Sequence, residues 1–236
     1  MSGPTLLLLH AFPLDARMWD EVGPSLGARG VRTVAPTLPV SPGRRDLGSW
    51  AEDVLRTIDG SFVPVGVSVG GYLTFELWRR APDRSTALVL CDTRAEAESD
   101  EGRAGRERTI ATIRSGGSEA VWRELEDRVL SPTASREVRE RARAIAASRE
   151  PEALVATVEA IRDRLDSTST LGTISVPALV VNGEDDAIVP LAEAAALANG
   201  IPGARLRAIP QAGHLAPFER PEAFTAAVAA FVEDAL

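Results

Sequence analysis

The stretch VPVGVSVGGYL, residues 63–73, places one serine among four valines and three glycines. The residues before Ser68 are apolar and β-branched, which is typical of a buried strand, and the residues after it repeat apolar side chains at helical spacing. The pattern Gly66-x-Ser68-x-Gly70 therefore lies at a strand-to-helix turn, where it can present a nucleophilic serine. Gly66 and Gly70 remove Cβ atoms that would collide at such a turn, and Gly71 lets the helix approach the sheet.

Short apolar runs alternate with helical patterns along most of the chain. Because the apolar runs are nearly continuous, they predict strands that are buried on both faces of a parallel sheet. The predicted strands cover residues 5–9, 31–35, 62–67, 87–91, 178–182 and 205–209. The predicted helices cover residues 18–28, 47–59, 69–80, 191–199 and 221–234. This alternation predicts an α/β fold, a doubly wound domain around a mainly parallel sheet.

Residues 94–166 break the alternation, because they contain no convincing strand. Charges dominate there, with 14 arginines against 16 acidic residues, and such a balance is typical of solvated, salt-bridged helix faces. Helices are expected over residues 119–130, 136–148 and 152–165, where apolar residues recur at helical spacing. We therefore predict a core made of residues 1–93 and 167–236, with residues 94–166 inserted as an all-helical lid.

Composition excludes several classes of function. The formal charge of −8 gives no electrostatic reason to expect nucleic acid or an anionic membrane as partner. No apolar run approaches the length of a membrane span and the N-terminus lacks a positive signal region, so a cytoplasmic protein is expected. With one cysteine, Cys91, and two histidines, we expect no disulfide within the chain, no metal and no cofactor. The sequence does not predict the oligomeric state.

A serine hydroxyl is a weak nucleophile unless a base takes its proton. The sequence has no lysine, so histidine is the leading candidate, and the two histidines are His10 and His214. His214 follows the last predicted strand, at the edge where parallel sheets bind ligands. A carboxylate that fixes the histidine tautomer is expected at the same edge. Four acidic residues follow strands there: Asp92, Glu184, Asp185 and Asp186.

Four segments resemble the α/β-hydrolase family, in the order that the family has along its chain. LLLLHAFPLDARMW (6–19) resembles the oxyanion loop and GVSVGGYL (66–73) the nucleophile elbow. VNGEDDAIVP (181–190) resembles the acid turn and QAGHLAPFERPEAF (211–224) the histidine loop. The small serine esterase, haloperoxidase-like and enol-lactonase-like branches are the most similar. The resemblance implies about six parallel strands in the order 2-1-3-4-5-6, without a counterpart of the family's first two strands.

The resemblance also implies a catalytic triad. In the family's acid motif the matching carboxylate stands three residues after Gly183, which selects Asp186 and makes Asp185 a turn residue. The resulting order Ser68, Asp186, His214 is the family's order of nucleophile, acid and base.

The oxyanion hole and the pocket are implied in the same way. The backbone N–H groups of Phe12 and Val69 would form the hole, with His10 in a structural role beside the loop. Where the family has His-Gly, this chain has His10-Ala11, so the loop must suit a residue with a Cβ atom. Further apolar residues are expected to line the substrate pocket: Leu14, Met18, Trp122, Pro217 and Phe218.

We therefore predict a serine hydrolase that cleaves a small-molecule carboxylic ester or lactone through an acyl-enzyme intermediate. Two alternatives remain at the level of sequence. One is a non-catalytic ligand-binding protein on the same scaffold. The other is a C–C bond hydrolase or acyltransferase that uses the same triad. The lid contains no motif that identifies the acyl or alcohol group.

Overall fold

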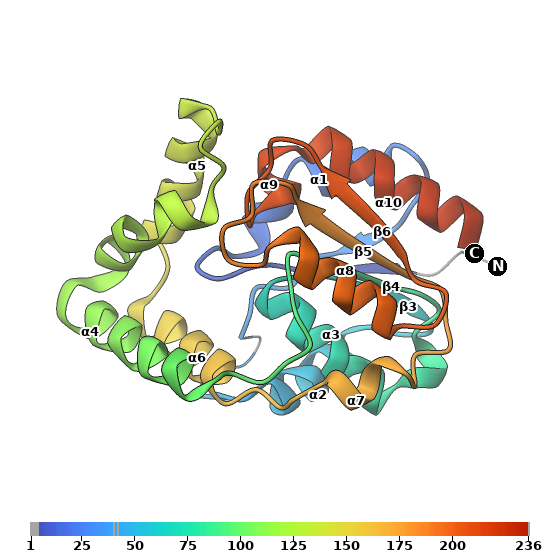
Figure 1. Ribbon diagram of the computed structural model, residues 1–236, viewed down its shortest axis with the longest axis horizontal. Coiled ribbons are helices and arrows are strands. Elements are labelled where there is room, and N and C mark those ends of the chain that lie inside the picture. Colours follow the sequence, from blue (N-terminus) through green and yellow to red (C-terminus); the bar gives the residue numbers. More distant parts are fainter. Residues whose placement is uncertain (1–4, 40, 42, 236) are drawn as a thin grey trace.

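The computed structural model describes residues 5–39, 41 and 43–235, and a six-stranded parallel sheet lies at the centre of this part (Figure 1). The strands are β1 (Thr5–Leu9), β2 (Thr33–Val34), β3 (Phe62–Val67), β4 (Leu88–Cys91), β5 (Ala178–Gly183) and β6 (Arg205–Ile209). Their order in the sheet is β2-β1-β3-β4-β5-β6, and every neighbouring pair is parallel. The predicted fold class and strand order are confirmed.

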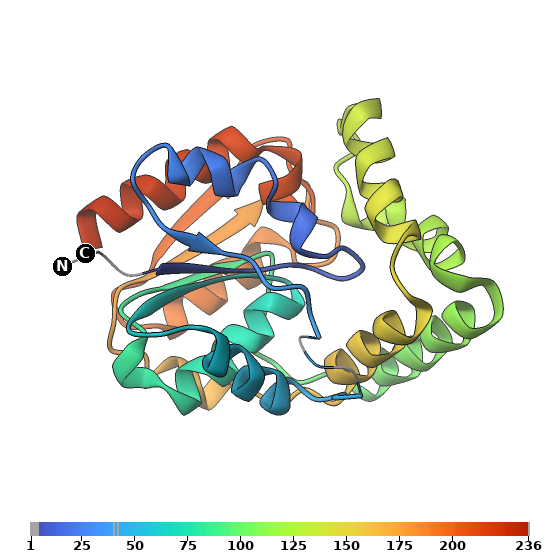
Figure 2. The ribbon, with the colours of Figure 1, turned by 180° about the vertical axis from the view of Figure 1, so that it is seen from behind.

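Helices cover both faces of this sheet (Figures 1 and 2). Helices α1 (Val22–Gly27) and α10 (Pro221–Ala235) pack on one face, against Leu6 and Leu8 of β1. Helices α2 (Leu47–Thr57) and α3 (Val69–Arg80) pack on the other face, against Leu7 and Leu9. On that same face, α8 (Leu191–Gly200) packs against β4 and β5. Successive residues of a strand point to opposite faces, so an all-leucine strand is buried on both sides.

Two predicted elements near the N-terminus are shorter than expected. The strand predicted over residues 31–35 is reduced to β2, an edge strand whose only neighbour is β1. The helix predicted over residues 18–28 is a 3₁₀ turn, η1 (Ala16–Trp19), followed by α1. The turn begins at Asp15, whose side chain accepts a hydrogen bond from the Arg17 backbone N–H at 3.0 Å. This local cap starts a separate turn before the helix.

All the regular structure between β4 and β5 is helical. Residues 94–166, all of which the structure describes, contain no strand. The helices there are α4 (Asp100–Val129), α5 (Arg136–Ala147) and α6 (Pro151–Arg162). Figures 1 and 2 show them projecting beyond the sheet, with α4 beside α6. The all-helical insertion agrees with the prediction, and its division from the core at residues 94 and 166 stays a prediction. The remaining short elements are η2 (Pro82–Arg84), α7 (Thr168–Leu171) and α9 (Ala216–Glu219).

Helix α4 is much longer than the helix predicted over residues 119–130. It is interrupted at Gly117, which has φ 71° and ψ −169°, so the helical parts are residues 100–116 and 118–129. The Ser99 side chain caps the first part by accepting a hydrogen bond from the Gly102 N–H at 3.0 Å. The sequence pattern does not reveal this part, because Ile110 and Ile113 are its only buried residues.

The turn between β3 and α3 brings three backbone segments into contact. A Cβ atom at Gly66 would overlap the carbonyl oxygen of Gly70, and one at Gly70 would overlap the carbonyl oxygen of Leu9. Ser68, between these two glycines, has φ 54° and ψ −113°, a conformation that residues with a side chain rarely adopt. The glycines therefore provide the clearance that the sequence predicts.

Replacing Gly70 by alanine is expected to lower the free energy of unfolding by about 1–3 kcal/mol, because the added Cβ meets backbone that cannot rotate away. Gly27→Ala is the matched control: no atom lies within 4 Å of its Cβ position, and alanine favours the helix by about 1 kcal/mol. Urea denaturation of both variants measures the difference. Equal stability of the two variants would contradict the proposed crowding at Gly70.

Candidate active site

The loops that follow β3, β5 and β6 bring Ser68, Asp186 and His214 together at the carboxyl edge of the sheet. Ser68 Oγ lies 2.9 Å from His214 Nε2, and His214 Nδ1 lies 2.8 Å from Asp186 Oδ2. All three residues are buried. Two hydrogen bonds thus connect a hydroxyl group through an imidazole ring to a carboxylate, the arrangement by which a base and an acid activate a serine.

The two adjacent aspartates of the acid turn have different partners. Asp186 Oδ1 accepts hydrogen bonds from the backbone N–H groups of Ile188 at 2.7 Å and Val189 at 2.9 Å, and this leaves Oδ2 for His214. Asp185 instead accepts a hydrogen bond from the Ser131 hydroxyl at 2.6 Å. The position of Asp186 is therefore fixed by its own turn.

Asp92, the competing acid in the sequence, ties the two other loops together. Its Oδ1 accepts a hydrogen bond from the Gly183 N–H at 2.8 Å, and its Oδ2 accepts one from the Ala216 N–H at 3.1 Å. Complete burial, followed by the negative charge of Asp186, raises the pKa of Asp92 to about 7. Asp92 therefore joins the acid turn to the histidine loop, while Asp186 bonds to the imidazole.

The end of α4 is attached to the histidine loop. The backbone N–H of His214 donates to the Val129 carbonyl at 3.0 Å. The buried Glu219 carboxylate accepts hydrogen bonds from the N–H groups of Ser131 and Gly213, each at 2.8 Å. Burial raises the pKa of Glu219 despite these bonds. These hydrogen bonds therefore hold the end of α4 against the loop that carries His214.

The two proposed oxyanion donors lie near Ser68. The backbone N–H groups of Phe12 and Val69 have no acceptor among the described residues. Phe12 lines the cavity at Ser68, and Val69 is the first residue of α3. Unpaired N–H groups can donate hydrogen bonds to the negative charge that develops on a substrate oxygen. Their role as an oxyanion hole stays a prediction.

His10 supports this loop as a neutral ring. Its Nε2 accepts a hydrogen bond from the Leu38 N–H at 2.8 Å, so Nδ1 holds the proton and donates to the Ala11 carbonyl at 3.1 Å. Burial, followed by the charge of Arg149, lowers the pKa of His10 to about 4. The Ala11 N–H donates to Met18 Sδ at 3.4 Å, and Ala11 is not among the described residues with a positive φ, so the loop suits a residue with a Cβ atom.

A small cavity of about 40 Å³ lies beside Ser68 and His214. Residues from four regions line it: Phe12, Tyr72, Arg106, Leu125, Val129, Ile161 and Ile188. A larger hollow of about 880 Å³ lies between α3 and the segment around α7, and none of the three residues Ser68, Asp186 and His214 lines it. We take the small cavity as the candidate site, because the reactive groups face it.

The pocket residues predicted from the sequence are all buried: Leu14, Met18, Trp122, Pro217 and Phe218. None of them lines the small cavity at Ser68. Leu14, Met18, Trp122 and Phe218 belong to the core cluster on the face of α1 and α10, which also contains the cavity-lining residue Val129. Their place in a substrate pocket stays a prediction. The residues that do line the cavity include Tyr72, one helical turn after Ser68, and that spacing is a signal that could have identified it.

Among the residues that the structure describes, no three histidine, cysteine, aspartate or glutamate side chains gather as the ligands of a metal ion would. Across the same residues no helix combines the length and the apolar character needed to span a bilayer.

Comparison with known proteins gives consistent matches along the whole chain. The model of the "Alpha/beta hydrolase family" matches residues 6–227. A pimeloyl-[acyl-carrier protein] methyl ester esterase of Aromatoleum aromaticum is 31% identical, with 92% of this chain and 93% of the relative covered. A malate-bound thermophilic esterase from Thermogutta terrifontis has a TM-score of 0.93 at 34% identity, covering 99% of this chain and 91% of that chain. The enol-lactonase of Burkholderia xenovorans has a TM-score of 0.83 at 26% identity, covering 99% and 92%.

Asp92 is expected to make stability depend on pH. Between its usual pKa of 3.8 and about 7, only the folded protein keeps the proton on this carboxyl, so its contribution to the free energy of unfolding falls as pH rises. Asp92→Asn removes this titration. Urea denaturation at pH 5 and pH 8 should therefore show a larger loss of stability in the wild type than in the variant. Equal losses in both proteins would contradict the raised pKa.

Proposed function

Because the chain belongs to the α/β-hydrolase family, we propose that it hydrolyses small carboxylic esters or lactones with Ser68, His214 and Asp186 as its catalytic triad. The observation that carries this proposal is the hydrogen-bonded path from Ser68 Oγ through the His214 ring to Asp186 Oδ2. That the protein is a carboxylic ester hydrolase rests on relatives and structural neighbours that are named esterases and match nearly its whole length.

The first step is acylation. Ser68 Oγ attacks the ester carbonyl carbon while its proton passes to His214 Nε2, 2.9 Å away. Asp186 accepts the Nδ1–H hydrogen bond, so the ring keeps the tautomer in which Nε2 is free to act as base. The carboxylate also stabilises the imidazolium that forms.

The negative charge of the tetrahedral intermediate needs hydrogen-bond donors. The N–H groups of Phe12 and Val69 supply them from the oxyanion loop and from the first residue of α3. One such donor contributes about 3–4 kcal/mol in measured cases. When the intermediate collapses, the alcohol leaves with the proton from His214.

The second step is deacylation. A water molecule attacks the acyl-enzyme carbonyl, and His214 takes one of its protons and returns it to Ser68 Oγ. The acid leaves and the hydroxyl is restored. A lactone follows the same path, except that its alcohol group stays attached to the acyl chain throughout, so that a single hydroxy acid leaves.

A second candidate substrate comes from the relatives. Several of the curated relatives are named pimeloyl-[acyl-carrier protein] methyl ester esterases, and the first of them covers 92% of this chain. Cleavage of such an ester releases methanol from the end of a long acyl chain. Methanol release from a methyl pimeloyl carrier-protein ester, compared with hydrolysis of p-nitrophenyl acetate, separates a dedicated enzyme from a general small-ester hydrolase.

Ser68→Ala is expected to lower kcat on p-nitrophenyl acetate to octanoate esters by about 10⁴-fold or more. The substitution removes the nucleophile and leaves the imidazole and carboxylate in place. Mass spectrometry after treatment with a fluorophosphonate should show label on Ser68 in the wild type and none in the variant. A wild type that neither hydrolyses any ester nor takes up label would indicate the non-catalytic alternative.

The adjacent aspartates provide a matched pair. Asp186→Asn is expected to lower kcat by about 10⁴-fold, because an amide in place of the carboxylate favours the wrong histidine tautomer. Asp185→Asn keeps an oxygen that accepts from Ser131, so its kcat should stay within a fewfold of the wild type. Circular dichroism checks that both variants fold. The assignment of the acid is wrong if only the Asp185 variant loses activity.

A further inference from the structure

A groove of about 530 Å³ adjoins the cavity that contains Ser68. Tyr72, Arg106, Leu125 and Ile188 line both spaces, so the groove and the cavity are directly adjacent. We call it the arginine groove because five arginines line it: Arg94, Arg106, Arg108, Arg128 and Arg164.

The charge of the arginine groove is opposite to the charge of the whole chain. Against the five arginines stand three acidic residues, Glu98, Glu101 and Glu124, which leaves a formal charge of +2. The chain as a whole has −8. A positive groove beside a catalytic cavity attracts an anionic substrate and raises its local concentration.

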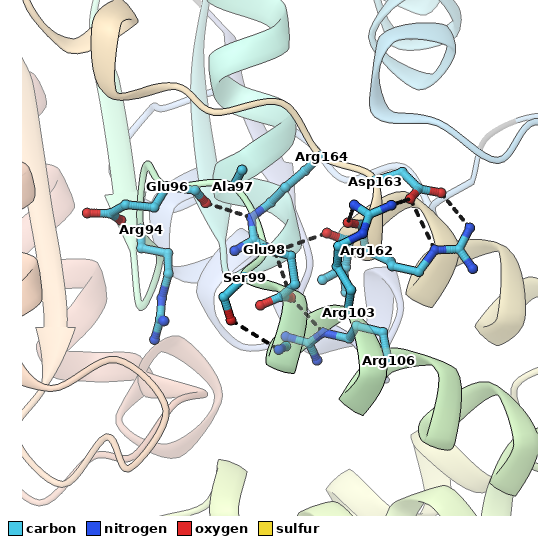
Figure 3. Close-up of polar contacts among 12 residues, drawn as sticks. Arg94, Glu96, Ala97, Glu98, Ser99, Arg103, Arg106, Arg162, Asp163 and Arg164 are labelled. Atoms are coloured by element: carbon cyan, nitrogen blue, oxygen red, sulfur yellow. Dashed lines mark hydrogen bonds and ion pairs between the residues drawn. The ribbon is translucent and has the colours of Figure 1, made fainter.

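Arg106 lies at the junction of the groove and the cavity, and only part of its hydrogen-bonding capacity is used (Figure 3). Its Nε donates to Glu98 at 2.8 Å, and Glu98 also accepts from Arg164 at 2.8 Å. The Arg164 side chain is buried and lies over the Tyr72 ring at 4.4 Å. One carboxylate is thus shared by two guanidinium groups, and the two terminal nitrogens of Arg106 have no acceptor among the described residues.

Other arginines of the helical insertion are used differently. Arg103 pairs with Asp163 at 2.8 Å, and Arg143 pairs with Glu119 at 2.6 Å. These pairs are exposed and join neighbouring helices, as salt-bridged surfaces commonly do. Arg108 and Arg128, by contrast, are exposed in the groove and form no ion pair with any described residue. Salt bridges between helices therefore account for Arg103 and Arg143, but they do not account for Arg108 and Arg128.

We propose that the arginine groove binds the carboxylate of an ester substrate while the ester carbonyl lies at Ser68, so that the preferred substrates are esters with an acidic end. The free terminal nitrogens of Arg106 form a planar fork that matches the two oxygens of a carboxylate. Arg108 and Arg128 add positive charge along the groove. This inference rests on the proposed esterase function and assigns the class of its substrate.

The test compares esters that differ in charge and hardly in shape. Methyl half-esters of succinic, glutaric and adipic acid are each paired with the ester whose free carboxylate is replaced by a primary amide. A second arm uses acetoxy acids and their amides, which place the acid on the alcohol side. The ratio of kcat/KM for acid over amide is measured by pH-stat titration. The chain length with the highest ratio reports the distance from Ser68 to the bound carboxylate.

In the wild type we expect kcat/KM to be about 10- to 100-fold higher for the acid than for the amide in at least one pair. A hydrogen bond to a charged group accounts for a difference of this size. Arg106→Gln should bring the ratio of kcat/KM for acid over amide close to one, because the guanidinium fork contacts the carboxylate that the amide lacks. Glu98 keeps Arg164 in this variant, so its half-buried carboxylate is not left unpaired. Arg123→Gln is the matched control, because Arg123 is on the same helix, is 71% exposed and does not line the groove.

Arg128→Gln provides a second variant that does not depend on the Glu98 pair, and it should lower the ratio by a smaller factor. Added salt should lower the wild-type ratio in the same direction, because exposed charges are screened. Equal kcat/KM for acids and amides, or hydrolysis of p-nitrophenyl acetate without hydrolysis of any acidic ester, would overturn the substrate class and leave the esterase function intact. Failure to hydrolyse p-nitrophenyl acetate or any other ester would instead overturn the proposed function.

Discussion

The position of Ser68 depends on the close approach of the α3 backbone to β1 and β3. Neither Gly66 nor Gly70 has room for a Cβ atom, because the carbonyl oxygens of Gly70 and Leu9 occupy those spaces. Between them Ser68 adopts a positive φ, and its N–H donates to the Cys91 carbonyl at 3.0 Å. Such a conformation persists only where the surrounding structure holds it on several sides. The nucleophile is therefore positioned by strands and a helix, independently of the other two loops.

The acid turn and the histidine loop need additional support, since neither is enclosed by regular structure. Two buried carboxylates outside the proposed triad provide it. Asp92 accepts from Gly183 and Ala216, and Glu219 accepts from Gly213 and Ser131. Each carboxylate satisfies two backbone N–H groups that would otherwise be buried without partners. Burial makes both carboxyl groups harder to ionise, and it therefore raises the pKa of Asp92 and of Glu219.

The sequence predicts the strands because strands buried on both faces leave continuous apolar runs, whereas the order of the strands in the sheet came from the resemblance to a family. It also predicts that Ser68, His214 and an acidic side chain would meet, since the candidates all follow strands at the same sheet edge. It could not separate Asp186 from Asp92 by pattern alone, because both follow strands, and only the resemblance to a family made the choice. The role of Asp92 depends on a positive φ at a residue that is not glycine, and no sequence pattern marks it.

The cavity lining was the least predictable part, because it depends on how α4 lies over the loops. The two parts of α4 contribute differently there. Residues 118–129 end at Val129, whose carbonyl accepts from the His214 N–H, so this part is coupled to the base. Residues 100–116 carry Arg106 and are separated from residues 118–129 by the break at Gly117. Substitutions before Gly117 can therefore alter the charge beside the cavity without displacing His214. The arginine groove draws on both parts of the helix, with Arg106 and Arg108 before Gly117 and Arg128 after it, whereas the hydrogen bond to the base comes from Val129 in the second part.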